Sequence, residues 1–263
     1  MGVIDQTAYG WVTPVLAYIT ACSGSAVALR SVKWALATEG SQRRNWLAVA
    51  SLTLGSSIWG MHFVAMLGFT VDGMQIRYNV QETVESLALA VAVVAVGIFT
   101  VGYGRRRVLR LLTGGLATGL GVAAMHYLGM AAMRMPGRIV YNRTTVGISI
   151  GIAVVAGTAA LWATLNVRGR WAVSAASLVM GVAVCAMHYT GMEAVAVRMP
   201  TDPGQAAATV QGATAPGFII PLLLGLMLSV FLNFVSIGYA PKPVKRQIQL
   251  PVQELTPWDA WQG

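Results

Sequence analysis

All three histidines of this 263-residue chain occur in one repeated pattern of residue types. A glycine precedes each histidine by seven positions and a methionine precedes it by one. An aromatic residue follows by one position, a small residue by three and a second methionine by four. The three copies surround His62, His126 and His188, at spacings of 64 and 62 residues. A pattern that recurs at a fixed period marks an internal repeat.

These residue types suit a metal ion. Neutral imidazole is a common metal ligand, and thioether sulfur is soft and suits Cu(I). Residues four apart share a helix face, so each histidine is expected to share one with the methionine that follows. We therefore predict a copper site whose ligands come from His62, His126, His188, Met61, Met66, Met125, Met130, Met187 and Met192. No aspartate in an apolar segment can orient a histidine for nucleophilic catalysis, so we expect no enzyme activity.

A structural role is the alternative for these side chains, with histidine joining helices by hydrogen bonds and methionine filling the core. Three copies in register favour the metal. Tyr127 and Tyr189 follow two of the histidines, where a hydroxyl could bond a bound cofactor or a ligand side chain, or lie in an interfacial belt. Cys185 and Glu193 have no counterparts in the other copies. We interpret Cys185 as a packing residue, and Glu193 as a surface charge or a modifier of the site.

The elements that carry these residues are membrane spans. The chain is 56% hydrophobic and 10% charged, with a mean hydropathy of +0.64, whereas a soluble domain is about 45–50% apolar and about 25% charged. Seven apolar segments are each long enough to cross about 30 Å of hydrocarbon. They run over 11–30, 46–69, 83–103, 108–133, 146–165, 171–195 and 217–239. We predict an all-α polytopic membrane protein of three two-helix repeats plus a seventh helix, with a membrane domain over 1–240 and a short tail over 241–263.

Small residues should let these helices approach closely. The glycine seven positions before each histidine is expected at a helix contact. The pairs Gly115 with Gly119 and Gly147 with Gly151 are expected to act in the same way.

The basic residues predict the orientation. The net charge is +9, and with the N-terminus outside, most basic residues fall in inner segments, as the positive-inside rule requires. These are Arg30, Lys33, Arg43, Arg44, Arg105, Arg106, Arg107, Arg110, Arg168, Arg170, Lys242, Lys245 and Arg246. The loop 134–143, with three arginines, opposes the arrangement, and Tyr78 is expected at the outer interface. Each histidine then lies about 24–27 Å from the inner start of its helix, so the three can converge around an axis along the membrane normal.

The third copy reads Met187-His188-Tyr189-Thr190. With its variants at 61–64 and 125–128, the chain resembles the bacterial MHYT-domain family over about residues 9–240. The resemblance implies a multi-pass sensor of the bacterial plasma membrane. Its Met and His residues would bind copper near the outer face and, through it, oxygen, carbon monoxide or nitric oxide. By position it implicates Met61, His62, Met125, His126, Met187 and His188, with Tyr127 and Tyr189. Many relatives carry a signalling domain; none is visible here, so we expect a cytoplasmic signalling partner.

Two other functions stay open from sequence. Two of the histidines could be axial ligands of haem in a membrane redox protein. Copper transport would need a ligand path through the bilayer, and the inner half lacks a matching His/Met series, so this reading ranks last. The basic clusters are interpreted as contacts with the lipid bilayer, not with nucleic acid.

Overall fold

The computed structural model describes residues 2–72, 74–103, 106–199 and 211–238, so the predicted tail 241–263 lies outside the described residues. Within this part the chain forms seven long helices, one for each predicted span. They are α1 (Val12–Leu36), α2 (Gly40–Met66), α3 (Val80–Tyr103), α4 (Arg107–Ala131), α5 (Arg143–Asn166), α6 (Arg170–Glu193) and α8 (Ala215–Gly238). The helices α1 to α6 are long and apolar enough to cross a membrane. The all-α, multi-span prediction is therefore confirmed.

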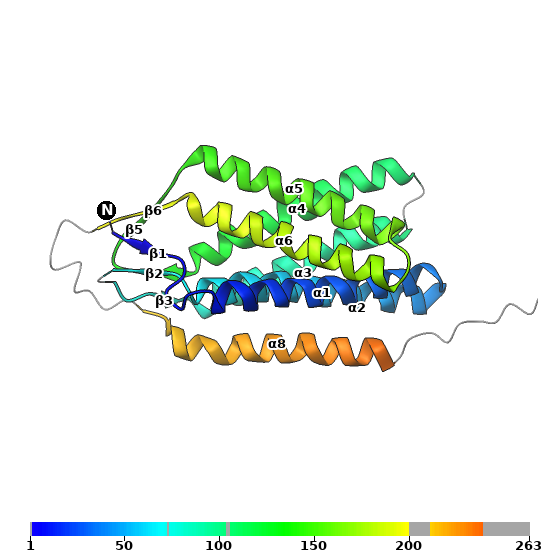
Figure 1. Cartoon of the computed structure of the whole chain (residues 1–263), viewed down its shortest axis with the longest axis horizontal. Coiled ribbons are helices and arrows are strands. Elements are labelled where there is room, and N and C mark those ends of the chain that lie inside the picture. The colour runs from blue at the N-terminus through cyan, green and yellow to red at the C-terminus, as the bar shows by residue number, and fades with distance from the viewer. Residues whose placement is uncertain (1, 73, 104–105, 200–210, 239–263) are drawn as a thin grey trace, which may run out of the picture.

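The helices α1 to α6 close into a ring of three two-helix units. Within the units α1 packs on α2, α3 on α4 and α5 on α6. Between units α2 packs on α3, α4 on α5 and α6 on α1. The even-numbered helices thus each touch the next unit, as a threefold arrangement requires. The helix α8 lies beside this ring against α2 and α1, and runs along them (Figure 1).

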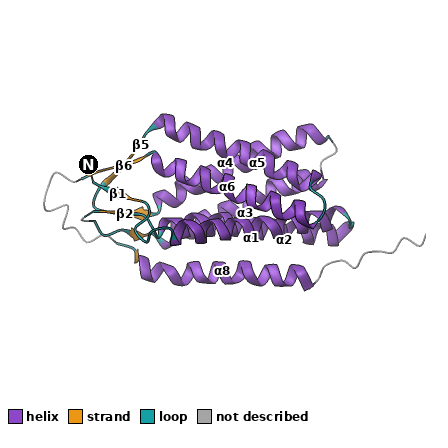
Figure 2. Ribbon diagram, in the orientation of Figure 1, coloured by secondary structure: helices purple, strands orange, loops and turns teal. Residues whose placement is uncertain are grey.

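Each unit also has a short strand before its first helix and another after its second. These strands pair antiparallel within their own unit, at the end of the bundle where the even-numbered helices finish (Figure 2). The pairs are β1 (Ile4–Asp5) with β2 (Thr70–Val71), β3 (Arg77–Tyr78) with β4 (Met133–Arg134), and β5 (Arg138–Tyr141) with β6 (Val195–Arg198). The strand β7 (Ala213–Thr214) precedes α8 and adds to β3. The repeat is therefore strand–helix–helix–strand.

The glycine seven positions before each histidine marks the contact between units, as predicted. A Cβ atom on Gly55 of α2 would lie 2.7 Å from the Cα atom of Val91 on α3. On Gly119 of α4 it would lie 2.4 Å from the Cα atom of Val154 on α5. On Gly181 of α6 it would run into side chains of α1. The glycine at this repeat position thus allows close helix packing at all three contacts between units.

Two expectations were wrong. Gly115 does pack on α5, but Gly147 and Gly151 have no neighbouring atom within 4 Å of an added Cβ, because they lie on the outward face of α5. Tyr78, expected at the membrane interface, is buried, and its hydroxyl donates to the carbonyl of Met66. Burial also raises the pKa of this phenol. The pairing of β3 with β4 and β7 encloses it, which composition alone does not reveal.

We expect Gly119→Ala to destabilise the fold by about 1–3 kcal/mol, because overpacking forces the backbone of α5 away. Gly151→Ala is the matched control in an open position, where alanine in a helix is favoured over glycine by about 0.5–1 kcal/mol. Thermal unfolding of both variants in detergent micelles measures the difference. Equal shifts for the two variants would show that the glycine does not form a contact between units.

Candidate metal centre

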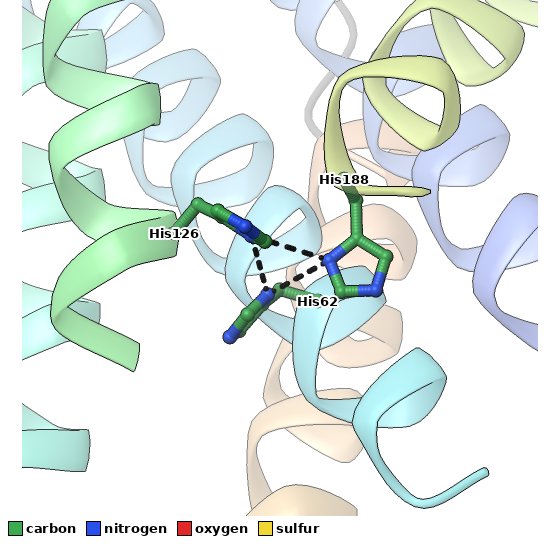
Figure 3. Close-up of side chains that lie close together, drawn as sticks. All are labelled: His62, His126 and His188. Atoms are coloured by element: carbon green, nitrogen blue, oxygen red, sulfur yellow. Dashed lines mark hydrogen bonds between the residues drawn. The ribbon is translucent and has the colours of Figure 1, made fainter. Parts of the chain in front are cut away.

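The structure brings the three predicted histidines together in the middle of the ring. His62 on α2, His126 on α4 and His188 on α6 are each at most 1% exposed. Their Nδ1 atoms form a triangle, with 3.0 Å between His62 and His188, 3.1 Å between His62 and His126, and 3.3 Å between His126 and His188 (Figure 3). The three rings stand nearly perpendicular to one another, at 80–85°. Each of the three repeat units therefore supplies one histidine of the cluster.

Hydrogen bonds cannot satisfy all three Nδ1 contacts of this triangle at once. A neutral imidazole nitrogen carries either one proton or one lone pair. However the protons are placed, at least one of the three contacts joins two lone pairs or two donors, and one N–H can point at only one of its two neighbours. The Nε2 atoms of His62 and His126 are also buried without a hydrogen-bond partner. Each unpartnered buried group costs about 1–3 kcal/mol.

A cation resolves the conflict, because three lone pairs that meet at one point can all bind it. Nitrogens held by one ion through bonds of about 2.0 Å lie about 3–3.5 Å apart, which matches the observed triangle. Among the described residues, these three histidines are the group of His, Cys and acidic side chains placed to hold a metal ion. The donor set therefore fits a metal.

Small residues fix the direction of the imidazoles. The Nε2 atom of His62 faces Gly129 on α4, where an added Cβ would lie 2.5 Å away. The Nε2 atom of His126 faces Gly191 on α6 at 2.4 Å in the same sense. Both glycines are the small residue three positions after a histidine. Their role is to receive the ring of the preceding unit, so that its Nδ1 is held toward the centre. The sequence shows that a small residue recurs at this position. Its role becomes clear only from the order of the helices around the ring.

The aromatic residue after each histidine supports its ring. The ring centroids of His62 and Phe63 lie 4.7 Å apart, those of His126 and Tyr127 4.8 Å, and those of His188 and Tyr189 5.0 Å, all steeply inclined. This contact is common to the three units, and Phe63 makes it without a hydroxyl.

The two tyrosine hydroxyls differ. Tyr127 shares a 2.6 Å hydrogen bond with Ser149 of α5, whereas the hydroxyl of Tyr189 is buried without a hydrogen-bond partner. A cofactor-binding role for the hydroxyls stays a prediction.

The six predicted methionines are all buried, at most 2% exposed. They are Met61, Met66, Met125, Met130, Met187 and Met192. Cys185 is half-buried and lies outside the three-histidine group. Glu193 is at the surface, where its carboxylate accepts a 3.1 Å hydrogen bond from Gln6. The group that the structure assembles is thus the three histidines, and a ligand role for the six buried methionines stays a prediction.

Fold and site together define a class, a repeat-built multi-span membrane bundle around a buried three-histidine cluster. The sequence matches the MHYT family, described as a bacterial signalling protein N-terminal repeat, over residues 55–114 and 119–177. The chain belongs to this family. Each matched segment begins at the glycine seven positions before a histidine. The third copy, from Gly181, lies outside both segments and is recognised by its pattern and by its place in the ring.

Several bacterial signalling proteins are similar to the chain. It is 35% identical over 226 residues to the bifunctional diguanylate cyclase/cyclic di-GMP phosphodiesterase MucR of Pseudomonas aeruginosa, covering 84% of this chain and 33% of that protein. It is 35% identical over 204 residues to the cyclic di-GMP phosphodiesterase NbdA of the same organism, covering 75% and 26%. Signaling protein YkoW of Bacillus subtilis is 29% identical over 67% of the chain and 23% of that protein. The chain thus spans a third or less of these relatives. No solved structure matches it.

Because the three Nδ1 atoms cannot all be hydrogen-bonded, we expect that removing one histidine does not destabilise the metal-free protein. With a chelator present, His126→Leu should leave the free energy of unfolding unchanged or raise it by up to about 3 kcal/mol, because an unpartnered polar group leaves the core. Tyr78→Phe is the control; it removes a satisfied buried hydrogen bond and should cost about 0.5–1.5 kcal/mol. Chemical denaturation in micelles compares the two. A loss for His126→Leu larger than that of the control would identify the cluster as a hydrogen-bonded structural element.

Proposed function

We propose that the chain is an integral membrane sensor that binds one copper ion through the Nδ1 atoms of His62, His126 and His188. The observation that carries this proposal is the convergence of three buried nitrogens at 3.0–3.3 Å. Imidazole and thioether groups favour copper, whereas magnesium and calcium prefer oxygen ligands. The buried methionines one position before and four positions after each histidine support the softer metal.

The bound ion would supply a coordination position for a small ligand such as oxygen, carbon monoxide or nitric oxide. The protein's own part is to hold three imidazoles at fixed angles and to keep the surroundings dry. Each imidazole belongs to a different repeat, so a change at the centre acts on α2, α4 and α6 together. A ligand shifts a protein between two states only by its difference in affinity for them. The opposite ends of these helices would pass that shift to a cytoplasmic signalling partner.

The orientation proposed is N-out and C-in in the bacterial plasma membrane, with α8 as the seventh span. The end opposite the histidines carries Lys33, Arg43 and Arg44, which supports an inner position under the positive-inside rule. At the histidine end, Arg134 forms an ion pair with Glu82. One arginine of the opposing loop is thereby neutralised, which weakens the objection that this loop raises.

The geometry favours a bare ion over haem. Two axial histidines must stand on opposite sides of a porphyrin, and nitrogens that already touch one another leave no space for it. It also disfavours transport. The side chains one turn from the cluster toward the opposite end are Ile58, Val122 and Val184, which offer a metal ion no ligand.

Metal analysis tests the proposal. Protein purified with Cu(I) should contain about one copper per chain, and the H62A/H126A/H188A variant should retain less than about a tenth of it, because the three ligands act as one site. Mass spectrometry of the metal content, with size-exclusion profiles as the control for folding, gives the result. The proposal fails if the wild type holds no metal or the variant holds as much.

Thiol labelling tests the orientation. In a Cys22→Ala/Cys185→Ala background, Gln75→Cys lies at the histidine end and Gln42→Cys at the opposite end, both exposed. A membrane-impermeant maleimide applied to intact cells should label position 75 and not position 42, because only outer residues are accessible. The reverse pattern would invert the proposed topology.

A further inference from the structure

An apolar cavity of about 40 Å³ lies next to the histidine cluster, on the side that faces the opposite end of the bundle. The even-numbered helices line it in two layers, with the residues four and eight positions before each histidine. These are Ile58, Val122 and Val184 in the first layer, and Leu54, Thr118 and Met180 in the second. A step of four residues is about 6 Å along a helix, so the cavity begins about one turn from the Nδ1 triangle. Met187, the neighbour of His188, also lines it.

The helices α2, α4 and α6 form three walls of the cavity, and the fourth wall, formed by α5, explains why the cavity is not filled by side chains. The helix α5 contributes only small residues, Ala153, Ala156, Gly157 and Ala160. On the α6 side, Ala183 continues the wall. Ala156, Ala160, Ala183 and Val184 are half-buried, so the wall between α5 and α6 is thin and borders the outer surface of the bundle.

Size and polarity restrict what can occupy this cavity. A water molecule needs about 10–15 Å³ and two to four polar partners; apolar cavities stay dry and can bind xenon. The volume would admit water, but the lining is aliphatic except for Met180, Met187 and the side chain of Thr118. An ion or a polar molecule would lose its hydration without compensation. A small, uncharged, apolar molecule of two or three atoms fits.

We propose that this cavity is the docking site of a diatomic gas, which enters from the lipid between α5 and α6 and is held one turn from the metal centre. The proposal rests on the proposed function and adds the place where its gas ligand docks and the route by which that ligand arrives. Apolar gases dissolve in the hydrocarbon of the bilayer, so a thin wall of small residues facing lipid is a suitable entrance.

Xenon is a probe of the cavity that needs no metal. Xenon NMR titration of the wild type in micelles should show saturable binding. Ala156→Val, which fills the cavity, should weaken binding at least ten-fold. Ala159→Val, on the exposed face of the same helix, should leave it unchanged. Val184→Ala, which enlarges the cavity, should strengthen binding at least two-fold, and it keeps the test decisive if Ala156→Val does not fold. The proposal would be overturned if xenon showed no saturable binding to the wild type, or if its affinity were the same in the wild type, Ala156→Val and Val184→Ala.

Carbon monoxide tests the route on the Cu(I)-loaded protein. Its association rate, followed by infrared absorption, should fall at least ten-fold in Ala156→Val and stay unchanged in Ala159→Val, with equal copper content in both. Equal association rates in the two variants would refute the gas-docking role. Absence of copper from the wild type would instead overturn the proposed metal function, while the xenon titration would still decide whether the cavity takes an apolar gas.

Discussion

Three buried imidazole nitrogens that point at one another are the constraint around which the bundle is built. An arrangement of His62, His126 and His188 within 3.3 Å is unfavourable for protons alone, since at most part of the triangle can be hydrogen-bonded. The chain holds it through features that recur from unit to unit, two of them in all three units and one in two. A glycine closes each joint between units, the aromatic residue after each histidine packs against its ring, and Gly129 and Gly191 accept the Nε2 edges.

Repetition gives a single chain a threefold site. Each strand–helix–helix–strand unit supplies one imidazole, and the ring closes because α6 meets α1. No unit can complete the cluster by itself, so the geometry of the cluster depends on the relative positions of all three. This is the physical basis for expecting a sensor. Under the proposed function, an ion bound by the three nitrogens would also draw α2, α4 and α6 together, and these helices reach the opposite end of the bundle (Figure 1).

Sequence alone predicted much of this arrangement. Apolar segment length located the helices, and the shared depth of the three histidines anticipated that they could meet. The glycines at Gly55, Gly119 and Gly181 were correctly assigned to helix contacts, because small residues at a fixed offset have few other uses in a membrane. The same reasoning failed at Gly147 and Gly151, since spacing does not say which face of a helix meets a partner.

The remaining features depend on tertiary placement. Strands of two to four residues are too short to carry a clear periodic signal, so neither the paired strands nor the burial of Tyr78 could be predicted. Which imidazole nitrogen faces the centre follows from the order of helices around the ring. The cavity beneath the cluster arises because small residues of α5 stand opposite Ile58, Val122 and Val184, and no single segment contains that information.

X-ray absorption at the copper edge of the Cu(I)-loaded protein is the decisive measurement for the three-histidine site, because it identifies the atoms bound to the ion. The expected spectrum shows three imidazole nitrogens at about 2.0 Å, and it also reveals whether a methionine sulfur joins them. A copper shell with fewer than three imidazoles would contradict the three-histidine site.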